Sequence, residues 1–314
     1  MAWVTWRQHR LQLAAAAGTL AALGIAALVT ALPMHAAYHR HALSACLPPT
    51  TRSGCDLIVR HFQSQFGSIV HLGDYLIVLP ALIGAFVGAP LVAREFEQGT
   101  YRFAWTQTIT RQRWLLGKIM LLAVGTIVFA FALSGMIVWW REPFDVVGGR
   151  IRPGPFDVEA IVVPAYALFA LVLGVLAGTV LRRTIAAMSV TLGLFFATRF
   201  AVAQLRPHYL PVEHQRVAGT TTATHARDWI VDNALVDAIG RRITTGREDL
   251  AIVHARRAGI DPQEYLLSLG WRRELSYQPA GRFWTFQAIE AGIFVALAVL
   301  LAAATVTILR RRQA

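Results

Sequence analysis

The sequence predicts an all-α polytopic membrane protein with six transmembrane helices. Of its 314 residues, 55% are hydrophobic and only 15% are charged, whereas average soluble domains carry about 25% charged residues. Such a composition excludes a disordered chain. It also argues against a nucleic-acid-binding protein, in which the net charge of +12 would form a patch on a polar surface. The apolar residues are gathered in six runs near the roughly 20 residues that a helix needs to cross a bilayer: 12–33, 75–93, 119–140, 160–181, 185–205 and 283–309.

The first two runs need separate justification. Arg7 and Arg10 precede the first run, as they would in a signal peptide, but its apolar core is longer than the usual 7–15 residues. No clean small-x-small cleavage site follows it, so we expect an uncleaved span. The second run is the shortest and carries Pro80 and Pro90, which a membrane helix tolerates where neighbouring helices satisfy the freed backbone groups.

Basic residues predict the orientation of the spans. If both termini lie in the cytoplasm, the inside segments hold 12 Lys and Arg in 44 residues, and the short outer loops hold 6 in 60. The positive-inside rule therefore favours an N-in, C-in topology, and we expect the protein in the plasma membrane. Residues 206–282 then lie outside, in a loop too long to contribute to the rule. The inside segments are 1–11, 94–118, 182–184 and 310–314.

The first outer loop carries the only two cysteines of the sequence, Cys46 and Cys55. Because this loop would face an oxidising compartment, we expect a disulfide, which stabilises such a short loop by about 2–3 kcal/mol. Two free thiols are the alternative. His35 and His39 have a zinc-compatible i, i+4 spacing, but nothing supplies further ligands, and no metal site is predicted.

The long outer loop, residues 206–282, is predicted to be an extracellular helical insertion. Asp261 and Glu264 have the pattern of a helix N-terminus, which gives a helix at 262–269. A further helical piece is expected at 248–258. Residues 227–244 are predicted to form an amphipathic helix because apolar residues recur there at helical spacing: Trp229, Leu235, Val236, Ile239 and Ile243. Whether this insertion contacts a substrate is left open.

Two ionisable residues lie inside the predicted spans, Arg199 in the fifth and Glu290 in the sixth. Each lies about 10 Å from the outer end of its span at a rise of about 1.5 Å per residue. Charges at such depth usually pair or line a cavity. We expect Arg199 and Glu290 to pair beside a substrate pathway, and separate snorkelling toward the outer headgroups is the alternative.

Glycine pairs occur in two of the spans. Gly84 and Gly88 lie in the second span, and Gly174 and Gly178 lie in the fourth. The small-x3-small spacing favours close helix packing, either within the chain or between protomers.

The cytoplasmic loop at 94–118 has features beyond its basic residues, and the positive-inside rule does not explain them. Thr100 can cap a helix, and an aromatic and apolar set follows it between residues 101 and 109. These features predict a short helix at the membrane surface that could dock into a groove of a soluble partner.

The residues of this loop resemble the signature of ABC-2 type permeases from actinobacteria, the membrane subunits of ATP-driven exporters. The resemblance rests on Arg94, Glu95, Glu97, Gly99, Thr100, Arg102, Gln107, Arg111, Trp114 and Lys118. It extends to Trp6-Arg7-Gln8-His9-Arg10 and to Tyr277-Gln278-Pro279, Arg282-Phe283-Trp284, Gln287 and Glu290.

This resemblance implies a single transmembrane permease domain over 1–314, with a type V exporter-like fold. It also implies that 94–118 is a coupling loop that receives motion from an ABC ATP-binding subunit. A second permease copy is implied as well, in a homodimer or a heterodimer.

The sequence lacks the motifs that would let the chain hydrolyse ATP itself. It contains no G-x4-G-K-[ST] phosphate cradle, no G-x-S-x-G elbow and no H-E-x-x-H motif. The chain is therefore predicted not to be an enzyme and to need no cofactor of its own, with ATP hydrolysed by the partner. The cargo is expected to be hydrophobic or amphipathic: a drug, antibiotic, lipid or peptide. A secondary transporter and a membrane sensor that binds a ligand through 206–282 are the alternatives.

Overall fold

The computed structural model describes residues 2–46, 54–97, 111–217 and 226–311. Six described helical segments are long and apolar enough to cross a membrane, which confirms the predicted all-α polytopic architecture. Five of the spans are carried by single helices: α1 (Ala2–Arg40), α6 (Arg111–Gly148), α8 (Val162–Leu181), α9 (Thr184–Leu205) and α12 (Phe283–Arg311).

The second span is longer than the predicted run 75–93 and extends over Leu57–Glu97. Pro80 and Pro90 do not interrupt it. A proline cannot donate to the carbonyl four residues earlier, and in both cases that carbonyl lies in a non-α turn, where the hydrogen-bond pattern already departs from i→i+4. The segments are α2 (Cys55–Asp74), 3₁₀-helical η2 (Tyr75–Ile77), α3 (Val78–Ile83), π-helical η3 (Gly84–Gly88) and α4 (Ala89–Glu97).

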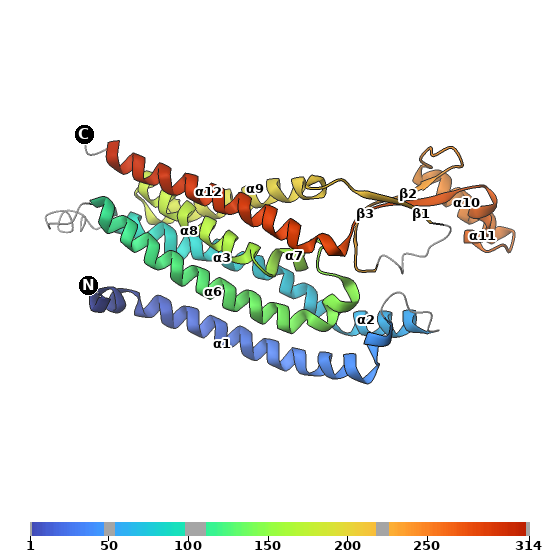
Figure 1. Ribbon diagram of the computed structural model, residues 1–314, viewed down its shortest axis with the longest axis horizontal. Coiled ribbons are helices and arrows are strands. Elements are labelled where there is room, and N and C mark those ends of the chain that lie inside the picture. Colours follow the sequence, from blue (N-terminus) through green and yellow to red (C-terminus); the bar gives the residue numbers. More distant parts are fainter. Residues whose placement is uncertain (1, 47–53, 98–110, 218–225, 312–314) are drawn as a thin grey trace.

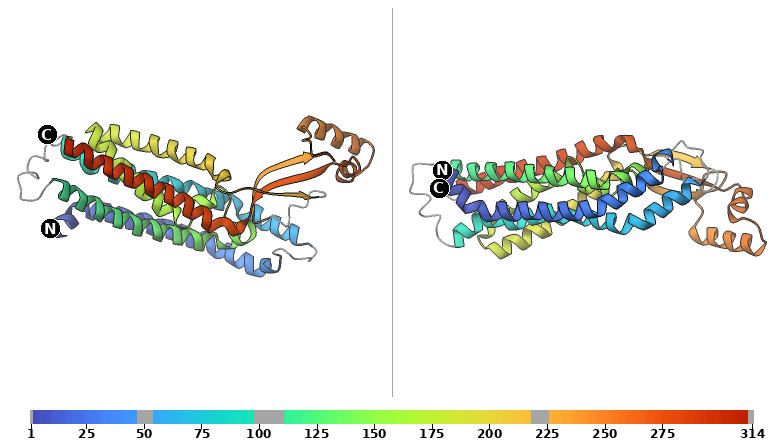
Figure 2. Two further views of the ribbon diagram at one scale, coloured as in Figure 1. Left: turned by 45° about the horizontal axis from the view of Figure 1, so that its top comes forward. Right: turned by 90° about the horizontal axis from the view of Figure 1, so that it is seen from below.

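The long helices run side by side in one bundle, and both termini lie at the same end of it (Figure 1). An even number of crossings gives this arrangement. A small sheet with two helices projects from the opposite end, which we call the outer end (Figure 2). Shorter elements at the outer end connect the spans: η1 (Leu43–Cys46), α7 (Pro155–Val158), η4 (Arg206–His208) and η6 (Ala280–Arg282).

Helix α8 is the central helix of the bundle. It packs against α12, α6, α9 and the η3–α4 part of the second span, and most of its residues are buried. The aromatic side chains of Tyr166 and Phe169 both meet the ring of Phe294 on α12. A helix that is apolar on every side is typical of such a central position.

Glycines allow α8 to approach the second span closely. A Cβ atom at Gly84 would collide with the backbone of Ala170, and one at Gly174 would collide with the backbone of Gly84 and Ala89. Gly88 and Gly178 are restricted in the same way. The close packing favoured by the small-x3-small spacing is therefore present, and it lies within the chain.

The insertion at 206–282 contains a sheet, which corrects one prediction. Its three antiparallel strands are ordered β1-β3-β2: β1 (Glu213–Val217), β2 (Trp229–Val236) and β3 (Arg272–Gln278). The predicted helix at 227–244 is wrong, because much of that segment is β2, which pairs with β3 from Trp229↔Gln278 to Val236↔Arg272.

The two other predicted helical pieces of the insertion are present. They are α10 (Thr245–Arg257) and α11 (Pro262–Ser268). The side chain of Asp261 accepts hydrogen bonds from the backbone N–H groups of Gln263 and Glu264, at 2.9 and 3.1 Å. Gly270 follows α11 with a φ of +75°, which is the left-handed conformation that ends many helices.

Candidate functional site

The predicted coupling residues begin at the end of the second span. Arg94, Glu95 and Glu97 lie in the last turn of α4. Arg111, Trp114 and Lys118 lie in the first turns of α6. Four further candidates, Gly99, Thr100, Arg102 and Gln107, lie outside the described residues.

The carboxylate of Glu97 binds the N-terminus of α9. Its Oε1 atom accepts a hydrogen bond from the backbone N–H of Thr184 at 2.9 Å, and its Oε2 atom accepts one from the Thr184 hydroxyl at 2.7 Å. Thr184 is the first residue of α9, where the positive end of the helix dipole favours a carboxylate. Beside this contact, the guanidinium of Arg182 lies 5.2 Å from the centre of the Phe96 ring. The end of α4 is thus joined to the α8–α9 turn.

A second candidate site is a group of ion pairs buried at the outer end, which we call the outer ion-pair network. Glu290 accepts two hydrogen bonds from Arg206, at 2.8 Å from Nε and at 2.7 Å from a terminal nitrogen. Asp157 accepts from Arg206 at 2.6 Å and also pairs with Arg199. Tyr166 donates its hydroxyl to Glu290. The network consists of Asp157, Tyr166, Arg199, Arg206 and Glu290.

The expected direct pair between Arg199 and Glu290 is replaced by a longer chain of contacts. Both residues are buried and lie in the same network, but Asp157 and Arg206 stand between them. The alternative of separate snorkelling does not describe them either, because Glu290 is fully buried and Arg199 is 9% exposed. Arg199 also lies over the ring of Tyr166, 5.3 Å from its centre.

The phenol of Tyr209 also contacts the network. Its hydroxyl donates to Glu290 at 3.2 Å. Burial, and then the negative charge of Glu290, raise the pKa of Tyr209 well above its ordinary value. Tyr209 therefore remains a neutral hydrogen-bond donor throughout the physiological pH range.

Sequence reasoning did not find Asp157, Arg206 or Thr184. Arg206 follows the predicted span 185–205 by one residue, and Asp157 lies in a predicted outer loop, where charged residues are ordinary. Their role depends on contacts across many residues of sequence, such as the 2.6 Å hydrogen bond between them. The only sequence signal was that both residues adjoin spans.

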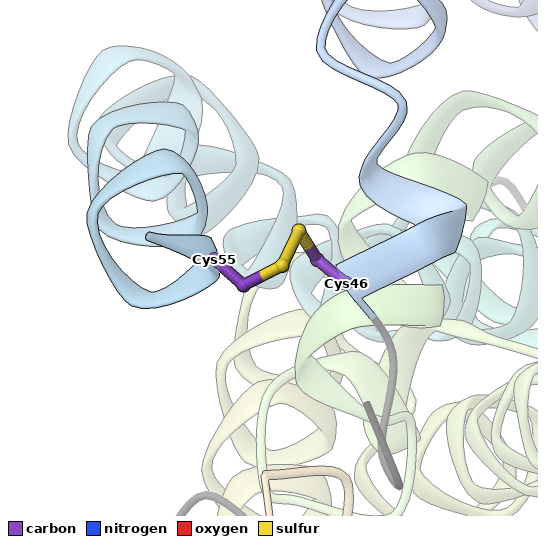
Figure 3. The surroundings of a disulfide bond; sticks show 2 residues. All are labelled: Cys46 and Cys55. Carbon is purple, nitrogen blue, oxygen red and sulfur yellow. A yellow bond between two sulfur atoms is a disulfide. The ribbon is translucent and has the colours of Figure 1, made fainter. Parts of the chain in front are cut away.

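The predicted disulfide is present. Cys46 at the end of η1 and Cys55 at the start of α2 are bonded, with their Cα atoms 5.3 Å apart (Figure 3). Both side chains are buried. The bond ties the outer end of α1 to the start of the second span.

The histidines considered as metal ligands have other contacts. The ring of His35 stacks on Trp139 with centroids 5.6 Å apart, and its Nε2 atom lies 3.3 Å from the Trp139 carbonyl oxygen. Within the part of the chain that the structure describes, no group of three or more His, Cys, Asp or Glu residues could hold a metal ion.

Buried Gln278 and the arginine Arg282 are two of the residues that hold the insertion at the outer end. Gln278, the last residue of β3, donates to the carbonyls of Pro207 and Leu210, at 3.1 and 2.8 Å. Arg282 donates to the carbonyl of Pro211 and to Glu213, at 2.7 and 2.9 Å. These contacts join the chain leaving α9 to the chain entering α12.

The architecture defines a multi-pass membrane protein with a helical bundle. Buried ion pairs lie at one end of the bundle, and the contact between Glu97 and Thr184 lies at the other. The chain matches the family described as ABC-2 membrane transporter related over residues 17–206, more than half of its length. It belongs to that family. Neither a curated protein nor a solved structure matches the chain.

Family membership makes the chain a membrane transport component. Members of this class associate in general with an ATP-binding subunit. The match ends at Arg206, and the insertion and α12 lie beyond it.

Proposed function

We propose that the chain is the membrane-spanning permease subunit of an ATP-binding cassette exporter of the plasma membrane. A separate ATPase subunit supplies the energy, and no cofactor is bound by the permease itself. The cargo is a hydrophobic or amphipathic compound such as a drug, antibiotic, lipid or peptide. Two permease copies, identical or different, form the complex, with both termini in the cytoplasm. The family match and the six apolar spans support this proposal.

The contact between Glu97 and Thr184 is the observation that carries the proposed mechanism. Residues 94–118 are the segment on which the ATPase would act in this proposal, and Glu97 lies near its start. Because the carboxylate of Glu97 holds both the backbone N–H and the hydroxyl of Thr184, a displacement of the segment would also move the start of α9. Helix α9 leads to Arg199 and Arg206 in the outer ion-pair network. This route would connect ATP hydrolysis at one end to opening at the other, by favouring one of two pre-existing states.

A first experiment tests whether an ATPase subunit is bound to the permease. The full chain is purified from its native membranes in mild detergent, and proteins that co-purify in a fixed ratio are identified. We expect a subunit with a G-x4-G-K-[ST] motif and ATPase activity that is lost when the permease is removed. An active transport preparation without such a subunit would contradict the proposal and would favour a secondary transporter.

A second experiment tests the coupling contact in the assembled complex. ATP hydrolysis and ATP-dependent uptake of lipophilic fluorescent dyes are measured together in inverted membrane vesicles. Glu97→Ala and Thr184→Val should lower the dye moved per ATP hydrolysed while leaving assembly intact. Thr184→Ser, which keeps the hydroxyl, is the matched control and should keep the ratio of the unaltered chain. Equal ratios in all four proteins would remove the role of this contact.

A further inference from the structure

A second group of charged side chains, three of them buried and two partly exposed, lies at the outer end, separate from the outer ion-pair network. It joins α2, α6 and the segment between α6 and α8. Arg141 donates to Asp74 at 2.8 Å, and Arg150 donates to Glu159 at 2.7 Å. The Nε atom of Arg141 also lies 3.5 Å from Asp145 and 3.3 Å from Glu159. We call Asp74, Arg141, Asp145, Arg150 and Glu159 the carboxyl cluster.

The charges of the carboxyl cluster do not balance. It contains three carboxyl groups and two guanidinium groups, which leaves one negative charge in excess if every group is ionised. Asp145 is 5% exposed and Glu159 is fully buried. The one other titratable group among the described residues in ion-pair contact with the cluster is His71, which lies 3.4 Å from Asp74 and is largely exposed. An uncompensated charge at such a depth is strongly unfavourable.

Two oxygen atoms of the cluster lack a hydrogen-bond donor. Among the described residues, neither Oδ2 of Asp145 nor Oε1 of Glu159 has a hydrogen-bond partner. The two carboxyl groups nevertheless lie close together, because both flank the same Nε atom of Arg141, at 3.5 Å for Asp145 and 3.3 Å for Glu159. Ionised carboxylates only accept hydrogen bonds, so neither can satisfy the other. One proton placed between them would supply the missing donor and remove the excess charge at the same time.

We propose that Asp145 and Glu159 form a proton-binding site that holds one proton at neutral pH. Asp145 carries the proton, because Glu159 already accepts a short hydrogen bond from Arg150, whereas the Arg141 Nε contact of Asp145 is 3.5 Å long. The side chain of Arg150 is 31% exposed and provides the polar route between this site and the solvent. With the proton bound, two carboxylates and two guanidinium groups remain, and the cluster is neutral.

Binding of this proton makes the junction of α2, α6 and the α6–α8 segment depend on pH. The unfolded chain releases the aspartate proton near pH 4, whereas the folded chain keeps it at neutral pH. The folded protein then binds more protons than the unfolded chain, and its stability falls as pH rises. Above the pH at which the site releases its proton, an unbalanced charge remains in the junction.

The test uses the purified full-length chain in detergent and requires no knowledge of the cargo. Infrared spectra are recorded at neutral pH in H2O and in D2O. The unaltered chain should show the C=O stretching band of a protonated carboxylic acid that shifts in D2O, and Asp145→Asn should lack it. Asp74→Asn should also lack it although Asp145 is intact, because removal of one carboxylate balances the cluster without a proton. The exposed Glu264→Gln is the matched control and should keep the band.

The pH dependence of unfolding provides a second readout. From mildly acidic to alkaline pH, the unfolding equilibrium of the unaltered chain should shift toward unfolding by up to tenfold per pH unit relative to Asp145→Asn. An unaltered chain without the band, a band that persists in Asp145→Asn, or parallel pH profiles would overturn the proposal. Stability at neutral pH that depends on added Na⁺ or K⁺ in place of a proton would also overturn it. None of these outcomes depends on whether the chain exports a cargo.

Discussion

Arg206 and Glu290 form a two-point ion pair in which both side chains are almost completely removed from solvent. The guanidinium donates from two nitrogen atoms to the two carboxylate oxygens, at 2.8 and 2.7 Å. Arg206 is 1% exposed and Glu290 is fully buried. The pair thereby fixes the outer end of α9, where η4 begins, against α12 and against Tyr166 of α8.

Removal of either partner of this pair should be strongly destabilising. Arg206→Leu leaves Glu290 buried without its main counter-charge, and such changes cost about 3–5 kcal/mol. Thermal unfolding of the detergent-purified chain measures the effect. The double variant Arg206→Leu/Glu290→Leu should lose less stability than the sum of the two single variants, because it leaves neither charge alone. Additive losses would show that the two side chains do not interact in the membrane protein.

Gly174→Val should destabilise the packing of α8 on the second span. A Cβ atom there would meet the backbone of Gly84 and Ala89, which cannot move aside as a side chain can, so we expect a loss of about 1–3 kcal/mol or more. Gly193→Ala in α9 is the control, since nothing lies within 4 Å of a Cβ at that glycine. Size-exclusion profiles and unfolding temperatures of both variants measure the effect, and equal profiles would contradict the close approach.

Cys46→Ser and Cys55→Ser should each lower stability by about 2–3 kcal/mol, because a closed loop of this length restricts the unfolded chain to that extent. The double variant should behave like either single variant, since all three lack the same bond. Maleimide labelling of the unreduced, denatured chain provides the direct check. Labelling of two thiols in the unaltered protein would show that the bond is absent from it.

Asp261→Ala should loosen α11 without affecting the spans. It removes the acceptor for two backbone N–H groups at the start of the helix, and loss of such a cap costs typically about 1 kcal/mol. Hydrogen exchange over residues 262–268 should become faster while exchange in α8 and α12 is unchanged. Asp261→Asn keeps a good capping side chain and should exchange like the unaltered chain.

The spans and the disulfide could be predicted because their signals are local. A run of about 20 apolar residues is sufficient to indicate a membrane helix. With only two cysteines in the sequence, both in one outer loop, each can form a disulfide only with the other. The capped helix at Asp261 belongs to the same class of signal. None of these predictions required knowledge of contacts between distant parts of the chain.

The error at 227–244 arises from an ambiguous apolar pattern. Trp229, Leu235 and Val236 fit one face of a helix, but they also fit a strand that is bounded by turn residues. The segment is a strand because it pairs with β3, which lies more than 30 residues further along the sequence. Tertiary context thus overrides a periodicity that favours helix.

The partners of Arg199 and Glu290 could not be predicted for a related reason. Their depth in the spans was evident, and so was the need for counter-charges. Asp157 and Arg206, however, lie at the edges of spans, where nothing in the sequence distinguishes them from solvated loop charges. Only the packing of α8, α9 and α12 brings them together, with Arg206 buried and Asp157 largely shielded from solvent.

The neighbouring position of β1 and β3 makes the insertion structurally modular. The chain leaves α9 through β1 and returns to α12 through β3, and the two strands pair from Glu213↔Tyr277 to Val217↔Arg273. Paired strands lie about 4.8 Å apart, so the exit and the re-entry of the chain are adjacent points on the bundle. A tight hairpin turn is long enough to close that gap. Ala226, Asp228 and Trp229 contact the bundle, but Val236 and Arg272 are themselves paired neighbours. We therefore expect that residues 237–271 can be exchanged for another sequence, or shortened, without moving the ends of the two spans that flank the insertion.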